Sequence, residues 1–273
     1  MEQTPERARF AIFAQMPWRT ILIVAAGLAF GTWLMLTPSG LLGKADAAGY
    51  AVCHRIGERS FHIGDRQMPL CARCSGMYLG ALVGMAYLTR FGKRAGMPVL
   101  KVAVVLGLAL VWFGVDGVNS YFHLFPGFRG IYEPSNWMRL VTGTGVGLGI
   151  AAVLTPAVHQ TLWPTVDDRP ALSGWRAFLP MVGLAGLIIL ALLSDLDVLL
   201  YPLALLSAVS VFLILSITYG VVWLLISKRA NSLLRYRQAW APLTAGFLTA
   251  LLQIGVFDAL RYWLTGTWAG FVF

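Results

Sequence analysis

The sequence has 273 residues, of which 58% are hydrophobic and 12% charged, with a mean hydropathy of +0.71. Soluble globular chains usually carry about 25% charged residues, so this composition excludes an ordinary soluble protein. A formal charge of +9 would suggest nucleic acid for a soluble chain, but basic loops beside anionic lipid explain it here. We therefore expect contact with a lipid bilayer and no nucleic-acid partner.

Seven apolar stretches predict membrane-spanning helices, since a bilayer core of about 30 Å needs roughly 20 apolar residues per helix. The hydrophobicity is continuous and does not alternate, which argues against barrel strands. The first stretch lacks a clear cleavage site and is interpreted as a retained span. The fold class is therefore an all-α, polytopic transmembrane helical bundle of about seven spans, with a short Cys/His loop between spans one and two. The expected spans are residues 20–37, 75–91, 98–115, 137–155, 178–194, 198–227 and 240–264.

A polar connection with three prolines, residues 156–176, predicts a division of the chain. The front half, residues 1–156, would contain four spans and the Cys/His loop. The rear half, residues 157–273, would contain three spans of unassigned role.

Glycines recur at helix-packing intervals in three of the spans. In lipid such faces let helix backbones approach closely, so they favour a packed bundle over a glycine-lined pore. The same faces would suit a homo-oligomer or another membrane protein as partner. These glycines are Gly76, Gly80 and Gly84 in span two, Gly27 and Gly31 in span one, and Gly143, Gly145, Gly147 and Gly149 in span four.

Charge predicts the orientation of the seven spans. With the N-terminus in the cytoplasm, most basic residues outside the cysteine segment, Arg7 and Arg9 among them, fall on the cytoplasmic side. The Cys/His loop then lies on the outer face. In either orientation this loop shares one side of the membrane with Asp116, the 195–197 turn and the Asp258/Arg261 end of span seven.

All three cysteines and two of the four histidines fall between Cys53 and Cys74. Cys71-Ala72-Arg73-Cys74 is a C-x-x-C motif just before span two, and Cys53-His54 precedes it. Three thiols and an imidazole suit tetrahedral zinc or another thiophilic metal ion, and the loop between the two pairs has a familiar zinc-site length. The expected metal ligands are Cys53, His54, Cys71 and Cys74. Because Cys53 and His54 are adjacent, His62 or water is an alternative fourth ligand.

The same cysteines allow a thiol-redox interpretation. A C-x-x-C motif at a helix N-terminus has a lowered thiol pKa, here aided by Arg73. A disulfide is permitted if the loop lies outside the cytoplasm, although three cysteines leave one unpaired. A thiol-disulfide oxidoreductase, or thiols without a specific role, therefore remain alternatives to the metal site.

Four arginines, Arg55, Arg59, Arg66 and Arg73, surround the cysteines. Guanidinium groups suit phosphate or carboxylate, and lipid headgroups carry such groups. The alternative is unspecific pairing with Glu58, Asp65 and membrane phosphates.

A second polar group is expected at the ends of spans three and four. Asn136, Arg139 and Gly143 share one face of span four. A charge on Arg139 is costly there unless it is paired, and Asp116 is the expected partner. The group is either a structural ion pair or a substrate or proton site, and Asp258 with Arg261 allows the same two interpretations. The expected polar-site residues are Arg59, Arg73, Asp116, Asn136 and Arg139.

The segments "CHRIGERSF", "PLCARCSGMYLG", "DG" and "NWMRLVTG" resemble an uncharacterised prokaryotic membrane family, domain of unknown function 2085. The resemblance covers residues 45–150. Gly57 stands where the family usually has proline, and Ser120 where a glutamine is expected. The resemblance implies a prokaryotic plasma (inner) membrane protein, but it implies no activity.

The sequence contains no P-loop, dinucleotide fingerprint or Ser-His-Asp pattern, and it leaves open whether the protein is an enzyme. The leading hypothesis is a membrane protein that binds a zinc-like metal through the Cys/His loop, beside the polar site. The alternatives are a transporter or lipid-handling protein, a thiol-disulfide oxidoreductase, and an assembly or structural subunit.

Overall fold

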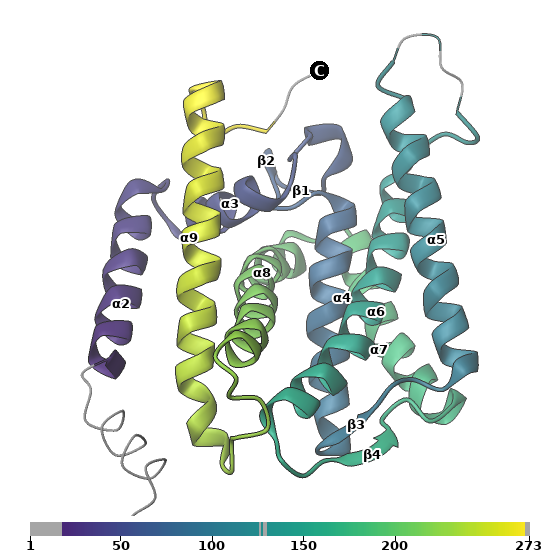
Figure 1. Ribbon diagram of the computed structural model, residues 1–273. Helices are drawn as coiled ribbons and strands as arrows, with labels where there is room; N and C mark the ends of the chain where they lie inside the picture. The colour runs from purple at the N-terminus through teal and green to yellow at the C-terminus, as the bar shows by residue number, and fades with distance from the viewer. Residues whose placement is uncertain (1–17, 126, 128–129, 271–273) are drawn as a thin grey trace, which may run out of the picture.

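A computed structural model describes residues 18–125, 127 and 130–270, so that Arg7 and Arg9 lie outside it. Long helices run side by side and form a bundle (Figure 1). Each of the seven expected spans is a helix. These helices are α2 (Trp18–Leu36), α4 (Ala72–Leu88), α5 (Leu100–Phe122), α6 (Asn136–Leu162), α7 (Trp175–Leu193), α8 (Asp197–Ile226) and α9 (Trp240–Thr265).

Six of these helices are long and apolar enough to cross a membrane. The seventh, α4, has 17 residues and is continued by the short 3-10 helix η2 (Thr89–Phe91). At 1.5 Å per residue α4 alone is about 25 Å long, and it lies inside the bundle beside α6. The structure confirms the all-α bundle.

Two ends of the bundle differ in what they carry (Figure 1). One end, named here the cysteine end, carries α3 (Leu41–Val52), the 3-10 helix η1 (Gly57–Arg59) and a small hairpin. That hairpin pairs β1 (His62–Ile63) with β2 (Arg66–Gln67) in antiparallel register. The described residues between α5 and α6 and the last turn of α9 lie at the same end. The α7–α8 turn does so too, since Asp197 accepts a hydrogen bond from the Gly64 N–H in the hairpin. These segments therefore lie at one end of the bundle, and their common side of the membrane stays a prediction.

At the opposite end, the α4–α5 connection pairs with the α6–α7 connection through two short parallel strands. These are β3 (Arg94–Gly96) and β4 (Asp167–Pro170). The Lys93 ammonium lies 3.7 Å from the centroid of the Trp163 ring, a cation–π contact between the two connections. The 3-10 helix η3 (Tyr236–Ala239) leads from this end into α9.

Helices α4 and α6 pack against each other through the expected glycines. A Cβ on Gly76 would meet the backbone of Leu140, and a Cβ on Gly143 would meet the backbone of Arg73. A Cβ on Gly147 would meet α4 in the same way. The glycine spacing of spans two and four is therefore a helix contact, as predicted. A Cβ on Gly27 or Gly31 would meet no described atom within 4 Å, so these two glycines mark no close helix contact in the described chain.

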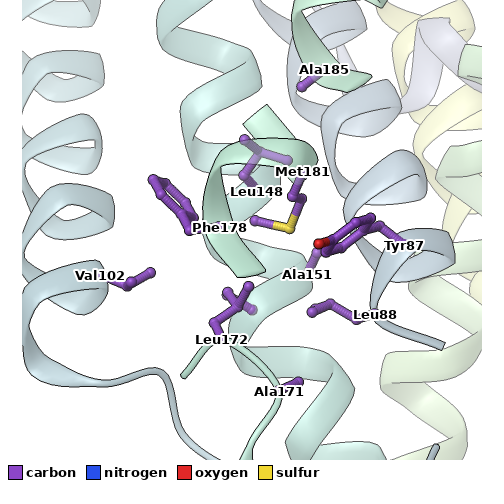
Figure 2. Packing of buried hydrophobic residues seen from close by; sticks show 11 residues of the cluster. Tyr87, Leu88, Val102, Leu148, Ala151, Ala171, Leu172, Phe178, Met181 and Ala185 are labelled. Atoms are coloured by element: carbon purple, nitrogen blue, oxygen red, sulfur yellow. The ribbon is translucent and has the colours of Figure 1, made fainter. Parts of the chain in front are cut away.

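The hydrophobic core joins helices from both predicted halves of the chain. Figure 2 shows one cluster in which Tyr87 and Leu88 of α4 meet Leu148 of α6 and Met181 of α7. A second cluster joins Leu79 of α4 with residues of α6, α7 and α8. The division at residues 156–176 stays a prediction. Both clusters contain residues of α4 together with residues from before and after this division.

Helices α5 and α6 each extend seven residues beyond their predicted C-terminal ends. Helix α5 runs seven residues past Val115, so that Asp116 lies inside it, because the polar side chains in that extension have partners in other segments. Helix α6 continues through Pro156 to Leu162, although proline removes one helical hydrogen bond. Its last turn is held by His159 and Gln160, whose side chains bond the carbonyls of Arg94 and Ala95. The first part of the expected polar connection is therefore helical.

Candidate metal centre and polar site

The three thiols converge at the cysteine end. The sulfur atoms of Cys53, Cys71 and Cys74 all lie within 4.8 Å of one another. Cys53 caps the C-terminus of α3, Cys71 is the N-cap of α4, and Cys74 lies in the first turn of α4. The Cys71 backbone N–H donates a hydrogen bond of 3.3 Å to the Cys53 sulfur. Two helix ends therefore bring residues 18 positions apart into one site.

The environment of the thiols is largely apolar. Cys53 and Cys71 are buried, and Cys74 is half-buried. Trp33 of α2, Leu251 and Ile254 of α9 belong to the same buried cluster. Helices α2 and α9, far apart in the sequence, thus help to cover the thiols.

The thiols differ in their ease of ionisation. Hydrogen bonding from the Cys71 side chain holds the pKa of Cys53 well below its usual range. The same contact, with Cys53 as acceptor, raises the pKa of Cys71 to about 12. Cys53 is therefore the first of these two thiols to become a thiolate, which is the form that binds a metal.

His54 follows Cys53 directly and is half-buried. Its Nδ1 accepts a hydrogen bond from the Ile56 N–H at 3.1 Å, which leaves Nε2 for any other bond. Burial lowers the pKa of His54, so its imidazole is neutral at pH 7, the form that binds metal ions. Within the described chain the group of converging ligands contains the cysteines alone. His54 as fourth ligand stays a prediction, and His62 is exposed on β1.

Two residues outside the expected site, Arg261 and Asp46, shape the backbone around the thiols. Arg261 of α9 donates hydrogen bonds to the carbonyls of Tyr50 and Cys53, both at 2.6 Å, and to that of His54 at 3.1 Å. Asp46 of α3 accepts from Arg55 at 2.8 Å and from Arg66 at 2.6 Å. Arg55 has a φ of 53°, so Asp46 fixes a sharp turn directly after His54.

The sequence contains a pattern that indicates α3, the short helix that carries Asp46. The segment after Pro38 is rich in small residues, Gly43, Ala45, Ala47, Ala48 and Gly49, which are buried in α3. This helix has 12 residues and is too short to span a membrane, which is why a search for long apolar stretches does not find it.

The polar site contains an ion pair, but its members differ from the expected ones. Asp116 pairs with Arg73 of α4, and its other oxygen accepts from the Tyr132 hydroxyl at 2.9 Å. Arg73 also donates to Ser120 Oγ at 3.2 Å. The expected pairing of Asp116 with Arg139 is therefore wrong, because Arg73, at the start of the neighbouring helix, occupies that carboxylate.

The other polar-site residues lie beside this pair. Arg139 donates to Asn136 Oδ1 at 2.8 Å, and Asn136 donates to the Glu58 carbonyl at 3.1 Å. Arg59 donates to the Ser120 carbonyl at 2.8 Å. The structure thus brings all five polar-site residues to the cysteine end, and adds Ser120 and Tyr132 to them.

Comparison with known proteins supports the resemblance. Residues 53–153 match the family described as "Predicted membrane protein (DUF2085)". An uncharacterized protein of Methanothermobacter thermautotrophicus is 32% identical over 111 residues, which cover 41% of this chain and 91% of the relative. An uncharacterized protein of Methanocaldococcus jannaschii is 30% identical over 112 residues, covering 41% of this chain and 67% of the relative. No solved structure matches the chain. The matched region begins at Cys53 and contains all three cysteines, so this chain belongs to the DUF2085 family of membrane proteins.

Proposed function

We propose that this integral membrane protein binds one thiophilic metal ion, such as zinc, through Cys53, Cys71 and Cys74. The observation that carries the proposal is the convergence of three sulfur atoms within 4.8 Å. A tetrahedral zinc site with Zn–S bonds of about 2.3 Å needs sulfur atoms about 3.8 Å apart, so the spacing suits a single ion. His54 is the proposed fourth ligand.

The position of the thiols suggests what the metal does. They join the end of α3 to the start of α4, beneath a turn that Arg261 and Asp46 hold in place. A bound ion would therefore fix the loop over the bundle next to the polar site. We also propose that this end faces the outside of a prokaryotic plasma membrane, with the N-terminus in the cytoplasm, on the support of the basic residues at the opposite end.

The test is elemental analysis of the purified full-length protein, with thiols counted in the same sample before and after denaturation in chelator. We expect about one metal ion per chain, and thiols that react fully only after the metal is removed. Each of Cys53→Ser, Cys71→Ser and Cys74→Ser should lose the metal. Three freely reactive thiols without metal would overturn the proposal.

The fourth ligand is tested with a matched pair of histidine variants. His54→Ala should weaken metal retention, whereas His62→Ala, which changes an exposed histidine of the same loop, should leave it unchanged. If neither variant has an effect, water or another group completes the site, and the His54 assignment is wrong.

The thiol-disulfide alternative uses the same sulfur atoms, and the thiol count separates it. One free thiol per chain without metal indicates a disulfide and would favour that activity.

The transport alternative depends on the polar site: there, Arg139→Ala should abolish flux in reconstituted vesicles while the metal content stays normal.

A further inference from the structure

The arginines at the cysteine end form two groups with different charge balance. Arg55 and Arg66 share the carboxylate of Asp46, which lies on α3. Arg59, Arg73 and Arg139 form the second group, named here the arginine cluster. Among the residues that the structure describes, the buried carboxylate paired within this cluster is that of Asp116.

The members of the arginine cluster lie close together. Arg59 and Arg73 both bond to Ser120, the first to its carbonyl and the second to its hydroxyl. Arg139 is linked through Asn136 to the carbonyl of Glu58, the residue before Arg59.

Both carboxylate oxygens of Asp116 already have partners other than Arg139. One of its oxygens pairs with Arg73, and the other accepts from Tyr132. Arg139 forms no ion pair within the described part of the chain, although it is only 7% exposed. Its Nε and the Nε of Arg73 are buried without a hydrogen-bond partner. Glu58 lies near Arg59 but is exposed and forms no ion pair among these residues.

The helix termini add to the positive potential. Helices α4 and α6 both begin at this cluster, and neither has an acidic residue in its first turn or a side-chain cap. The N–H groups of a helix N-terminus and its dipole favour an anion. Buried guanidinium groups of like charge are costly unless an anion neutralises them, and guanidinium forks match the oxygen atoms of phosphate.

We propose that Arg59, Arg73 and Arg139 form a binding site for a phosphate group, carried by a lipid headgroup or by a soluble phosphate. Arg139 would contribute its buried Nε donor, and Arg59 and Arg73 are half-buried and so are within reach of a ligand from outside the bundle. The site adjoins the thiols but does not depend on a metal being bound there.

The experiment measures thermal unfolding of the purified full-length protein in two settings. In detergent, inorganic phosphate is compared with chloride at equal ionic strength. In nanodiscs, phosphatidylcholine with phosphatidic acid is compared with phosphatidylcholine alone. We expect a rise in Tm of about 5 °C when the phosphate group is about 100-fold above its Kd. A rise with inorganic phosphate indicates a soluble ligand, and a rise only with phosphatidic acid indicates a headgroup.

Three variants make the test specific. Arg59→Gln and Arg139→Gln should each abolish the rise in Tm, whereas Arg66→Gln, which removes the same charge from the same loop, should retain it. If Arg139→Gln does not fold, the half-buried Arg59 still decides the outcome. The proposal is overturned if no phosphate compound raises Tm, or if Arg59→Gln responds as Arg66→Gln does. Metal content, measured in the same samples, should be equal in Arg59→Gln and Arg66→Gln.

Discussion

Arg261, in the last helix, donates a hydrogen bond of 2.6 Å to the carbonyl of Cys53, the first residue of the family match. The matched region ends at residue 153, so this contact ties a helix outside it to the thiol site. The same guanidinium lies 3.9 Å from the centroid of the Tyr50 ring. The rear half of the chain thus has a structural role at the cysteine end.

Replacing Arg261 by glutamine should loosen the thiol site. The change removes charge-assisted bonds to backbone carbonyls beside the proposed ligands, and loss of such supporting contacts typically lowers metal affinity 10- to 100-fold. Competition with a chelator of known affinity measures this effect. Arg237→Gln, an exposed arginine at the opposite end, is the control and should retain wild-type affinity. Equal affinity in both variants would show that Arg261 does not position Cys53.

Asp116→Asn should strongly destabilise the bundle. It leaves Arg73 without its buried counter-charge, and breaking a buried pair from one side typically costs about 3–5 kcal/mol. The free energy of unfolding in mixed detergent measures the loss. Asp168→Asn, at an exposed position, should change it by less than about 0.5 kcal/mol.

The double variant Arg73→Gln/Asp116→Asn extends this prediction. Since it removes both charges, it should lose less stability than the sum of the two single losses. Strict additivity would mean that the two residues do not form the pair described here.

Gly143→Ala should separate α4 from α6. A Cβ at this position meets the backbone of Arg73, which cannot move aside as a flexible side chain can. We expect a loss of about 1–3 kcal/mol in the free energy of unfolding, as for other overpacked sites. Gly149→Ala on the same helix has open space and should be neutral or stabilising by up to about 1 kcal/mol. Equal effects of the two substitutions would contradict the close contact.

Trp33→Phe should weaken the attachment of α2 to α9. The Trp33 indole N–H donates to Asp258 Oδ2 at 3.0 Å, and Asp258 Oδ1 is buried without a partner. These residues border a cavity of about 640 Å³ between the two helices. Without the indole N–H the buried carboxylate loses a donor, which costs about 1–3 kcal/mol of stability. Thermal unfolding measures the loss, and Trp263→Phe, at a largely exposed position, should show none.

The spans and their shared polar face could be predicted from the sequence, because continuous hydrophobicity and span order suffice for both. Helix ends were predicted less well. The polar residues after Val115, which are Asp116, Asn119 and Ser120, look like the start of a loop. They instead continue α5, because Arg73 and the backbone carbonyl of Tyr132 form hydrogen bonds with their side chains. Helix α3 could not be predicted as a span, because it has only 12 residues and includes Lys44 and Asp46.

The sequence by itself determined that the chain is a helical membrane protein with its reactive residues in one short segment, since lipid restricts the chain to apolar helices whatever their packing. Only the tertiary structure decided which charges meet. Whether Arg73 or Arg139 reaches Asp116 depends on the rotation of α4 against α5, which spacing along the chain does not specify. The convergence of the three thiols likewise required α3 to end where α4 begins, because a sulfur cluster is set by backbone placement and not by the number of cysteines.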